Sequence, residues 1–443
     1  MKRIGKLVLP IYIIINIVCI LVCSYLNLIN KLSAWKFFSV YKKVLIINIV
    51  VIIIMSIIRI IKKQKFNFSK IDIFMIFILI FLYISYLYAI RKDVALHGIP
   101  GRYEGLYTIL YYFSVYFLST FIDKKYKKVI VYSILLVGLI NTFYAIFQVT
   151  NITKSLEAKG ILTIFRRYHN KKLWATGFIT NPNFFAALEL MCLGYTIGLF
   201  IDAKKIVAKI IFGILIPIFM IGLLISDCLA CLVALICVYI YALIYAIKNK
   251  KYWRIFLVLI LLAFITEVLV FNNQTNLLND FVKTSNETKE VIKGNIKDNY
   301  GSSRMFIWKN TLKIVPKNII NGVGIDNFYY AFGDKPLWKG KYFYDKAHNE
   351  YLQILICEGI FALISYLVFY FIIIFRGIKN NYKEKSIYLI LPVIGYLIQA
   401  FFSFSVIEVA PIFYISLGLL VDRDNIIKKE VNNDKKSKRH NKK

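Results

Sequence analysis

The sequence predicts an all-α membrane protein with about twelve transmembrane helices and one large extracytoplasmic loop that contains short amphipathic helices. Three observations support this fold class. The 443 residues are 59% hydrophobic and 16% aromatic, with a mean hydropathy of +0.64, whereas a soluble domain is about half apolar. The apolar residues fall in runs long enough to cross a bilayer, and the basic residues gather in short clusters between them.

The formal net charge of +33 would suggest a nucleic-acid partner in a soluble protein. In this chain the basic clusters alternate with apolar runs, so the charge reflects membrane topology and attraction to anionic lipid headgroups. We therefore expect membrane lipids, and no nucleic acid, among the partners.

Twelve apolar runs give the expected spans, because a helix needs about 20 mostly apolar residues to cross the hydrocarbon core. The runs cover residues 7–29, 44–61, 71–90, 105–122, 129–149, 182–201, 207–225, 228–247, 255–271, 350–375, 386–404 and 407–421. The apolar stretch around Ser226 and Asp227 is about twice the length that one span needs, so we divide it there.

The positions of the basic clusters predict which side of the membrane each loop faces, because short cytoplasmic loops carry an excess of Lys and Arg. The clusters follow every second span, at residues 59–70, 124–128, 204–209, 248–254 and 376–385. We therefore expect a multi-pass protein of the cell membrane with both termini in the cytoplasm.

This orientation divides the chain into four expected regions. They are an N-terminal transmembrane region of about nine helices (1–271), an extracytoplasmic loop that carries the chemistry (272–347), C-terminal transmembrane helices (348–421) and a basic cytoplasmic tail (422–443). The loop is the sizeable polar unit in an otherwise apolar chain, so the working residues should lie in it or face it.

The seven cysteines all lie in apolar segments, and none lies between Asn272 and Ala347. The large loop therefore has no disulfide. The spacing of His and Cys residues does not indicate structural zinc, so we expect no metal and no cofactor. Buried, unreactive thiols are the favoured interpretation.

One segment of the large loop, residues 302–315, has the pattern of an amphipathic helix. The residues expected on its buried face recur at spacings of three and four: Met305, Trp308, Leu312 and Val315. Ser302 or Ser303 can cap the start of this helix, and Pro316 marks its end.

Arg304 falls in the first turn of that helix, where free backbone N–H groups and the helix dipole favour anions. Its guanidinium offers a two-pronged donor that suits phosphate oxygens. Arg304 is therefore a candidate phosphate ligand. The plainer alternative is a surface arginine whose charged end reaches toward water.

His348 stands at the boundary between the polar loop and the next apolar run. With an ordinary pKa near 6.5, an imidazole can take a proton from a hydroxyl nucleophile or donate hydrogen bonds to a phosphate. Glu350 and Glu358 are close enough in sequence to influence it. The alternative is that His348 only caps the helix or lies at the membrane interface.

Three further outer loops hold polar groups that could converge on the large loop: residues 97–106, residues 166–184 and the turn at Ser226 and Asp227. Three carboxylic residues, Glu189, Glu267 and Glu408, lie at membrane depth or near its boundary. Such groups are costly there unless they face water or a partner, so each is a candidate for a direct role.

Several motifs together resemble the O-antigen ligase and polymerase family. The motifs are His348-Asn349-Glu350-Tyr351-Leu352-Gln353 with the residues that follow, Ser303-Arg304 with Trp308, Asn321-Gly322-Val323-Gly324, Gly101-Arg102-Tyr103-Glu104-Gly105-Leu106, Thr176-Gly177 with Asn181-Pro182-Asn183, and Phe401-Phe402-Ser403-Phe404. The likeness extends from about residue 97 to residue 421. No single motif is decisive, but their order and sidedness are fairly specific.

The resemblance implies a metal-independent membrane glycosyltransferase that uses a saccharide donor linked to a polyprenyl pyrophosphate on the outer face. It implies that Arg304 grips the pyrophosphate and that His348 lies beside the reacting centre as a base or a phosphate ligand. The residues that it implies for substrate binding are Arg102, Glu104, Arg166, Arg167, Asn349 and Trp308.

One departure from the family pattern concerns the turn Ser226-Asp227-Cys228, where many members carry Ser-Arg-Gly. An aspartate at that place would repel phosphate. Either another arginine of the outer loops substitutes for the missing one, with Arg102, Arg166 and Arg167 as the candidates, or the activity is altered.

The resulting hypothesis is an enzyme that polymerises, or alternatively ligates, oligosaccharide units from an undecaprenyl-pyrophosphate carrier to make a surface polysaccharide such as a capsule. The acceptor would be a glycan or a lipid-linked saccharide, and other polysaccharide assembly proteins are further candidate partners. The alternatives are a transporter of a glycan or small anion, and a non-catalytic homologue that binds the carrier. A transporter predicts inverted repeats, and the sequence shows no convincing internal repeat.

Overall fold

The structure is a computed structural model that describes residues 2–28, 33–61, 69–150, 168–169, 172–271, 274–333, 336–384 and 386–421. Arg166, Arg167 and the basic tail (422–443) lie outside these residues, so the expectations for them are not addressed by the structure.

Within the described residues, nine helices are long and apolar enough to cross a membrane. They are α1 (Lys2–Leu28), α2 (Ala34–Ile61), α3 (Lys70–Leu87), α6 (Lys124–Val149), α8 (Pro182–Asp202), α9 (Ile206–Ile225), α10 (Leu229–Lys248), α11 (Tyr252–Thr266) with its π-helical continuation η1 (Glu267–Phe271), and α15 (Ile360–Glu384). The all-α polytopic fold class is confirmed, and the division of the long apolar stretch at Ser226 is confirmed by the end of α9.

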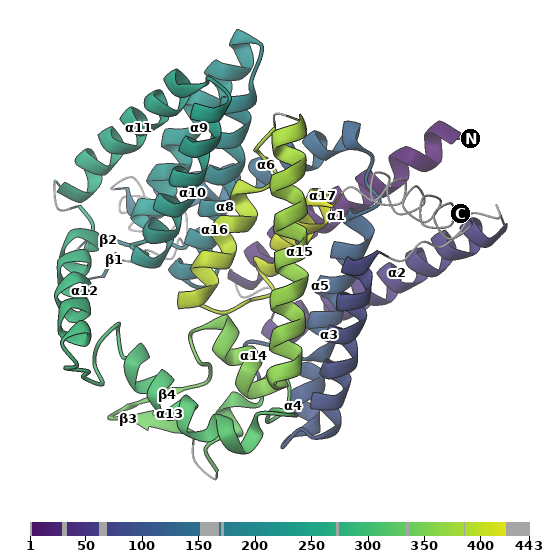
Figure 1. The fold of residues 1–443 in the computed structure, drawn as a ribbon, viewed down its shortest axis with the longest axis vertical. Helices are drawn as coiled ribbons and strands as arrows, with labels where there is room; N and C mark the ends of the chain where they lie inside the picture. Colours follow the sequence, from purple (N-terminus) through teal and green to yellow (C-terminus); the bar gives the residue numbers. More distant parts are fainter. Residues whose placement is uncertain are drawn as a thin grey trace, which may run out of the picture.

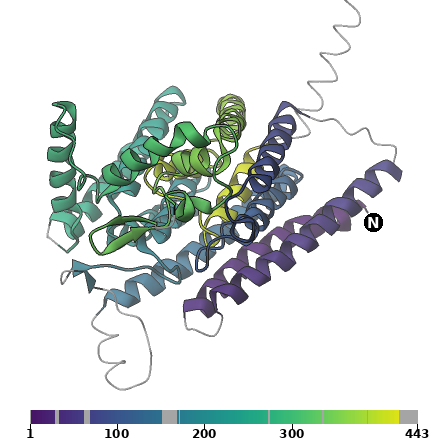
Figure 2. The ribbon, with the colours of Figure 1, turned by 90° about the horizontal axis from the view of Figure 1, so that it is seen from below.

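Three shorter apolar helices complete the bundle: α5 (Leu106–Ser119), α16 (Leu391–Gln399) with the 3-10 turn η3 (Ala400–Phe402), and α17 (Ala410–Leu420). The count of twelve crossings remains a prediction. Helix α8 is the buried axis of the bundle, since nearly all of its side chains are shielded by α6, α9, α10 and α16. Figure 2 shows α1 and α2 side by side along one flank.

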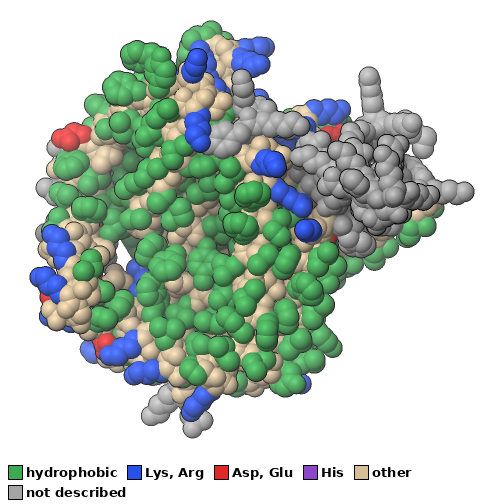
Figure 3. All heavy atoms as spheres, in the orientation of Figure 1, with side chains coloured by type: hydrophobic (Ala, Val, Ile, Leu, Met, Phe, Trp, Pro, Cys, Tyr) green, Lys and Arg blue, Asp and Glu red, His purple; other side chains and the backbone are tan. Residues whose placement is uncertain are grey.

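The outer surface of the helices is apolar, as expected for contact with lipid. Large hydrophobic side chains are exposed along α2, α9 and α11. Figure 3 shows hydrophobic side chains across most of one face, with Lys and Arg mainly toward its edges. Because soluble proteins rarely expose such extended apolar surface, this pattern supports a membrane-embedded bundle.

The elements that position the candidate site gather at the lower end of the bundle in Figure 1. They are α4 (Lys92–His97), α12 (Leu277–Ile292), α13 (Arg304–Asn318), η2 (Asn327–Tyr330), the hairpin of β3 (Leu337–Lys339) and β4 (Tyr342–Tyr344), and α14 (Glu350–Glu358). A second antiparallel pair joins β1 (Tyr168–His169) to β2 (Lys172–Leu173). The loop elements have a small hydrophobic core of their own, centred on Ile307, Val323, Phe328 and Ile356.

The expectation of one continuous helix over residues 350–375 is wrong. The chain ends α14 at Glu358 and begins α15 at Ile360, with Gly359 between them at φ +89°. A side chain at residue 359 would place its Cβ 2.1 Å from the carbonyl oxygen of Ile320, so only glycine fits. Helix α14 therefore packs with the loop core and is not the beginning of a span.

The predicted face of the amphipathic helix is only partly right, since Val315 is buried and Trp308 packs against the loop core, but the other positions differ. The inward side of α13 consists of Ile307, Thr311 and Val315, whereas Leu312 is 56% exposed. Ser303 does stand at the N-cap position, in a left-handed conformation, but its side chain makes no capping hydrogen bond. The helix also continues past Pro316 to Asn318.

Candidate functional site

His348 lies between the β3–β4 hairpin and α14, with its backbone in the left-handed region at φ +50°. The next residue, Asn349, is the N-cap of α14, and its side chain accepts a hydrogen bond from the backbone N–H of Leu352 at 3.0 Å. The imidazole meets the ring of Phe404 edge to face, with ring centroids 5.3 Å apart. The ring of Tyr344 lies on another side, at 6.4 Å. Aromatic rings thus fix the orientation of the imidazole.

The peptide before His348 is held from two sides. The indole Nε1 of Trp308 donates to the carbonyl oxygen of Ala347 at 3.0 Å, and the N–H of Ala347 donates to Oε1 of Gln353 at 2.8 Å. Because Ala347 is fully buried, these bonds satisfy backbone groups that water does not reach. Trp308, expected to bind substrate, is therefore placed where it also positions the backbone of His348.

Arg102 reaches the same region from the loop before α5. Its Nε donates to Asp345 at 2.9 Å, and its guanidinium lies over the ring of Phe404, 5.4 Å from the centroid. Burial alone would raise the pKa of Asp345, but the charge and hydrogen bond of Arg102 hold that pKa below its ordinary value. One edge of Arg102 is occupied by this ion pair.

Lys346 is a second cation beside His348, and it is almost completely buried. It forms an ion pair with Asp326 and also lies over Phe404, 5.6 Å from the centroid. Burial alone would lower the pKa of Lys346, but the negative charge of Asp326 and that of Glu104 raise it above its ordinary value. Lys346 is therefore charged and already neutralised by a carboxylate.

Asp326 connects this ion pair to the rest of the site. One carboxylate oxygen pairs with Lys346, and the other accepts the backbone N–H of Ile99 at 2.7 Å. The residue adopts a left-handed conformation at φ +57°. A short segment before it, which contains Gly322 and Gly324, is bonded to the end of α14, where the N–H of Gly324 donates to the carbonyl of Cys357 at 2.9 Å. The Gly-x-Gly turn thus binds the C-terminal end of α14 through backbone hydrogen bonds.

Arg304 is the first residue of α13 and differs from the other two cations. Its Nη1 donates to the carbonyl of Gly301 at 3.2 Å, while its buried Nε has no hydrogen-bond partner. In the part of the chain that the structure describes, Arg304 forms no ion pair with a carboxylate, whereas Arg102 and Lys346 each have one. Its guanidinium therefore retains the capacity to bind an anion.

The electrostatic surroundings keep His348 neutral. Burial lowers the pKa of His348 to about 4, and the nearby positive charges of Arg304, Arg102 and Lys346 add to that effect against the opposing charge of Asp345. At neutral pH the imidazole is thus an unprotonated base next to cations. This combination can accept a proton while the cations stabilise negative charge.

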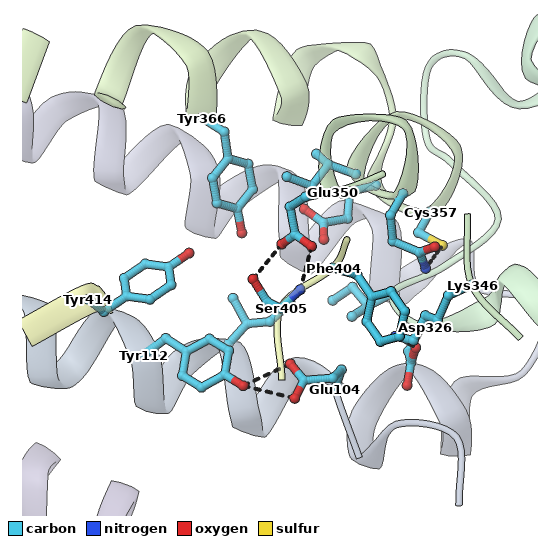
Figure 4. A pocket seen from close by; sticks show the side chains of 15 residues that line it. Glu104, Tyr112, Asp326, Lys346, Glu350, Cys357, Tyr366, Phe404, Ser405 and Tyr414 are labelled. Atoms are coloured by element: carbon cyan, nitrogen blue, oxygen red, sulfur yellow. Dashed lines mark hydrogen bonds and ion pairs between the residues drawn. The ribbon is translucent and has the colours of Figure 1, made fainter. Parts of the chain in front are cut away.

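A cavity of ≈ 40 Å³ lies next to this cluster and shares Phe404 and Lys346 with it. In Figure 4 the Glu350 carboxylate lies against Ser405, from which it accepts bonds of 2.7 and 2.8 Å. The Glu104 carboxylate accepts the hydroxyl of Tyr112 at 2.8 Å. Burial raises the pKa of both carboxyl groups. Glu104, expected to bind substrate, thus lies in the cavity behind Phe404.

A second cavity of ≈ 40 Å³ is lined by Arg102 and by Asn27 of α1 and Phe37 of α2. Glu408 lines it and accepts the hydroxyl of Thr180 at 2.9 Å. Burial raises the pKa of Glu408 to about 7, although Thr180 and the charge of Arg102 act in the opposite direction. Arg102 and Glu408 therefore line a cavity distinct from the one that Glu104 lines.

Asp227, the residue that departs from the family pattern, has a structural role. Its carboxylate accepts two bonds of 3.0 Å from Asn276, one from the backbone N–H and one from the side chain. These bonds tie the turn between α9 and α10 to the start of α12. The negative charge is thus directed toward Asn276.

The structure gathers most of the predicted site residues. His348, Arg304, Arg102, Trp308 and Asn349 come together at one end of the bundle, and Glu104 lines the adjacent cavity. The sequence did not single out Asp326, Asp345 and Lys346 as functional residues, and it gave Phe404 no role. The available signal was that Asp345 and Lys346 lie three and two positions before His348. Among the described residues, no three His, Cys, Asp or Glu side chains gather as metal ligands.

The comparisons with known proteins support one family. Residues 212–367 match the family model described as O-antigen ligase, and the match runs from α9 into α15 and includes Arg304 and His348. The expected resemblance is thereby confirmed. No curated protein matches the chain.

Proposed function

Because residues 212–367 match the family model described as O-antigen ligase, we propose that this multi-pass membrane protein is a glycosyltransferase. It transfers an oligosaccharide from an undecaprenyl-pyrophosphate carrier to a glycan or a lipid-linked acceptor and so builds a cell-surface polysaccharide. We favour a polymerase over a ligase because residues 101–106 resemble polymerase-type members. In this proposal the large loop is extracytoplasmic, and both termini are cytoplasmic.

One observation carries the proposal. The imidazole of His348 is neutral and lies close enough to Arg304 for the positive charge of Arg304 to lower its pKa. Arg304 itself has no acidic partner among the described residues, and its buried Nε has no hydrogen-bond partner. Glycosyl transfer from a pyrophosphate donor needs this pair of functions, a base for the acceptor hydroxyl and a cation for the departing pyrophosphate. The donor is already activated, so positioning and electrostatics supply the catalysis.

The proposed step is a single displacement. The acceptor hydroxyl oxygen forms a bond to the anomeric carbon of the donor sugar, and the bond from that carbon to the pyrophosphate oxygen breaks. His348 takes the hydroxyl proton, and the polyprenyl pyrophosphate leaves with the electron pair of the broken bond. Arg304 binds the pyrophosphate oxygens through its two-pronged donor, and Arg102 adds positive charge from its place over the ring of Phe404.

The remaining predicted residues act on the geometry of the site. Trp308 and Asn349 hold the backbone on either side of His348, and both are candidates for contact with the saccharide. Glu104 is placed to interact with sugar hydroxyls that enter the cavity beside Phe404. Arg166 and Arg167 stay predicted members of the anion site.

The test uses purified protein in liposomes with a defined undecaprenyl-pyrophosphate oligosaccharide and a gel that resolves chain length. A ladder of products indicates a polymerase, and a single addition indicates a ligase. His348→Ala and Arg304→Ala should lower product formation by about 10²-fold or more, while Lys283→Ala, a change on helix α12, should not. Intact donor in every lane, over a range of donors and acceptors, contradicts the proposal and favours a transporter or a non-catalytic homologue.

A further inference from the structure

The cavity that Arg102 and Glu408 share, the Glu408 cavity, combines charged and polar groups with aromatic rings. Besides the guanidinium and the carboxylate it has an amide, a hydroxyl and a phenyl ring, from Asn27, Thr180 and Phe184. Apolar walls with a few well-placed polar groups are typical of pockets for small organic ligands. The function proposed above leaves this cavity without an occupant.

Glu408 keeps hydrogen-bonding capacity that the protein does not use. Its Oε2 accepts the hydroxyl of Thr180 at 2.9 Å, and the backbone N–H of Thr180 lies 3.3 Å from both oxygens. An ionised carboxylate can accept about four hydrogen bonds, so these two donors leave room for more. Because only 6% of Glu408 is exposed, further donors must reach it through the cavity.

Arg102 has the complementary capacity. Among the described residues its side chain forms one hydrogen bond, from Nε to Asp345 at 2.9 Å. A guanidinium has five N–H donors, so the others remain available to a ligand. A sugar hydroxyl both donates and accepts a hydrogen bond. A carboxylate and a guanidinium that line one cavity therefore suit neighbouring sugar hydroxyls.

The Glu408 cavity can be reached from the surface and has a limited size. Gly101 and Thr180 on its lining are exposed, and the side chain of Arg102 is 31% exposed. Its volume is ≈ 40 Å³, whereas a water-sized group needs about 10–15 Å³ measured in the same way. The cavity thus holds about three such groups. That space suits the hydroxyls along one edge of a sugar, with the rest of the ring outside.

One aromatic ring connects this cavity to the proposed base. Phe184, on the cavity wall, meets Phe404 edge to face with ring centroids 5.3 Å apart. Phe404 in turn meets the imidazole of His348 at 5.3 Å. A sugar whose one edge lies in the cavity is therefore near enough to His348 to offer it a hydroxyl from its other edge.

The cavity and the proposed pyrophosphate ligand belong to different parts of the site. Helices α1 and α2 line the cavity, whereas Arg304 begins α13 and its charge acts on Cys228 at the start of α10. In a single displacement at an anomeric carbon, the entering oxygen and the leaving group lie on opposite faces of the sugar ring. This separation favours the acceptor sugar, and not the donor sugar, as the occupant.

We propose that the Glu408 cavity binds one edge of the acceptor sugar, with Glu408 accepting from its hydroxyls and Arg102 donating to them. The inference rests on the proposed glycosyl transfer and names the place where the acceptor is held. Glu408 makes and breaks no covalent bond in this role. It is a binding residue that determines which acceptor sugar fits.

The kinetic test varies donor and acceptor separately. The acceptor carries the oligosaccharide on a plain alkyl chain in place of the pyrophosphate, so that it cannot act as a donor. Glu408→Gln retains the shape of the side chain but not its charge, so the KM for the acceptor should rise about tenfold. The KM for the donor should stay within about twofold. Glu290→Gln, a change on the surface helix α12, is the matched control.

A binding test does not depend on turnover. Saturation-transfer NMR measures the affinity of full-length protein for the same alkyl oligosaccharide. Glu408→Ala and Glu408→Gln should weaken binding about tenfold or more, while Arg304→Ala should not weaken it. Thermal unfolding shows whether each variant is folded, and Glu408→Gln serves if Glu408→Ala is not.

The outcomes separate this inference from the proposed function. Products in wild type, together with an unchanged acceptor KM and affinity in Glu408→Gln, overturn the inference and leave the glycosyl transfer standing. A rise in the donor KM in place of the acceptor KM also overturns it and assigns the cavity to the donor sugar. If wild type makes no product but binds the alkyl oligosaccharide through Glu408, the proposed transfer fails and the cavity remains a saccharide site.

Discussion

The ring of Phe404 lies edge-on to the imidazole of His348, with centroids 5.3 Å apart and planes at 75°. The same ring lies under the charged ends of Arg102 and Lys346. One aromatic side chain therefore sets the spacing between the proposed base and two cations. Contacts of this kind are individually modest, but misplacement of a reacting group is costly.

Phe404→Leu should keep the fold and lower the transfer rate, by about tenfold, because the imidazole and the two cations lose their common support. The measurement is the initial rate of donor consumption in liposomes. Phe375→Leu serves as the control, since Phe375 is 57% exposed on α15. Equal rates for the two variants would contradict the role assigned to Phe404.

The pH dependence of transfer should reflect a neutral base. With the pKa of His348 near 4, the transfer rate should be flat above about pH 5 and fall about tenfold for each pH unit below 4. A rate that instead begins to fall near pH 6.5 would show that His348 titrates as in an unfolded chain or is not the base. The profile of residual activity in His348→Gln provides the comparison.

The pH dependence of stability follows from the same group. The folded-state pKa of His348 lies below its ordinary value of 6.5, so the unfolded chain binds more protons between pH 6.5 and pH 4. The contribution of His348 to the free energy of unfolding is fully present above pH 6.5 and is lost as the pH falls toward 4. Thermal unfolding in detergent should show that wild type loses more stability over this range than His348→Gln.

Arg304→Ala should lower the transfer rate by about 10²- to 10³-fold, because the departing pyrophosphate loses a charged donor. Arg304→Lys should recover only part of the rate, since an ammonium group supplies charge without the two-pronged geometry. A competition assay with inorganic pyrophosphate checks the assignment. Weaker inhibition in both variants is expected, and unchanged inhibition would assign the pyrophosphate to another cation.

Asp326→Asn should destabilise the protein by about 3–5 kcal/mol, because it leaves the buried ammonium of Lys346 without its counter-charge. Asp93→Asn is the matched control. Asp93 likewise forms an ion pair, with Arg91, but its side chain is 62% exposed, so a loss of less than about 1 kcal/mol in stability is expected. The double variant Asp326→Asn, Lys346→Met should recover part of the loss. Comparable thermal shifts for the two single variants would argue against a buried ion pair.

Gly359→Ala should destabilise the protein by about 3 kcal/mol or more, because alanine must adopt a positive φ and its Cβ meets the carbonyl of Ile320. Gly294→Ala is the control. Gly294 has nearly the same φ, +86°, but open space around it, so only the backbone strain of about 1–2 kcal/mol remains. A similar loss in both variants would show that the break between α14 and α15 tolerates a side chain.

The sequence was informative wherever a single stretch determines the structure. Apolar runs predicted the helices of the bundle, and the residues proposed for the site from the sequence, Arg304 and His348, lie close enough together for the charge of Arg304 to lower the pKa of His348. The prediction of one helix over residues 350–375 failed because the sequence does not show that Gly359 adopts a positive φ. The buried face of α13 was predicted only in part, because Ile307 and Thr311 fit a helical spacing with Val315 as well as Leu312 and Trp308 did.

The contacts between distant segments were beyond sequence patterns. The pairing of Arg102 with Asp345 joins residues 243 positions apart, and Phe404 looks like any other apolar residue of its run. The role of Asp227 was also hidden, because its partner Asn276 lies 49 positions away at the start of another helix. These contacts depend on how the helices pack against one another, and the spacing of residues within one segment carries no information about that packing.

The carboxylate of Asp326 bonds to the backbone of Ile99, which precedes it by 227 residues. During synthesis Ile99 leaves the ribosome long before Asp326 exists, and so do Arg102 and Glu104. The loop that contains Ile99 must therefore wait until α5, the five long helices described between it and residue 271, and most of the large loop have been made. Completion of the candidate site is accordingly a late event in the synthesis of the chain, and a chain that ends before residue 326 lacks it.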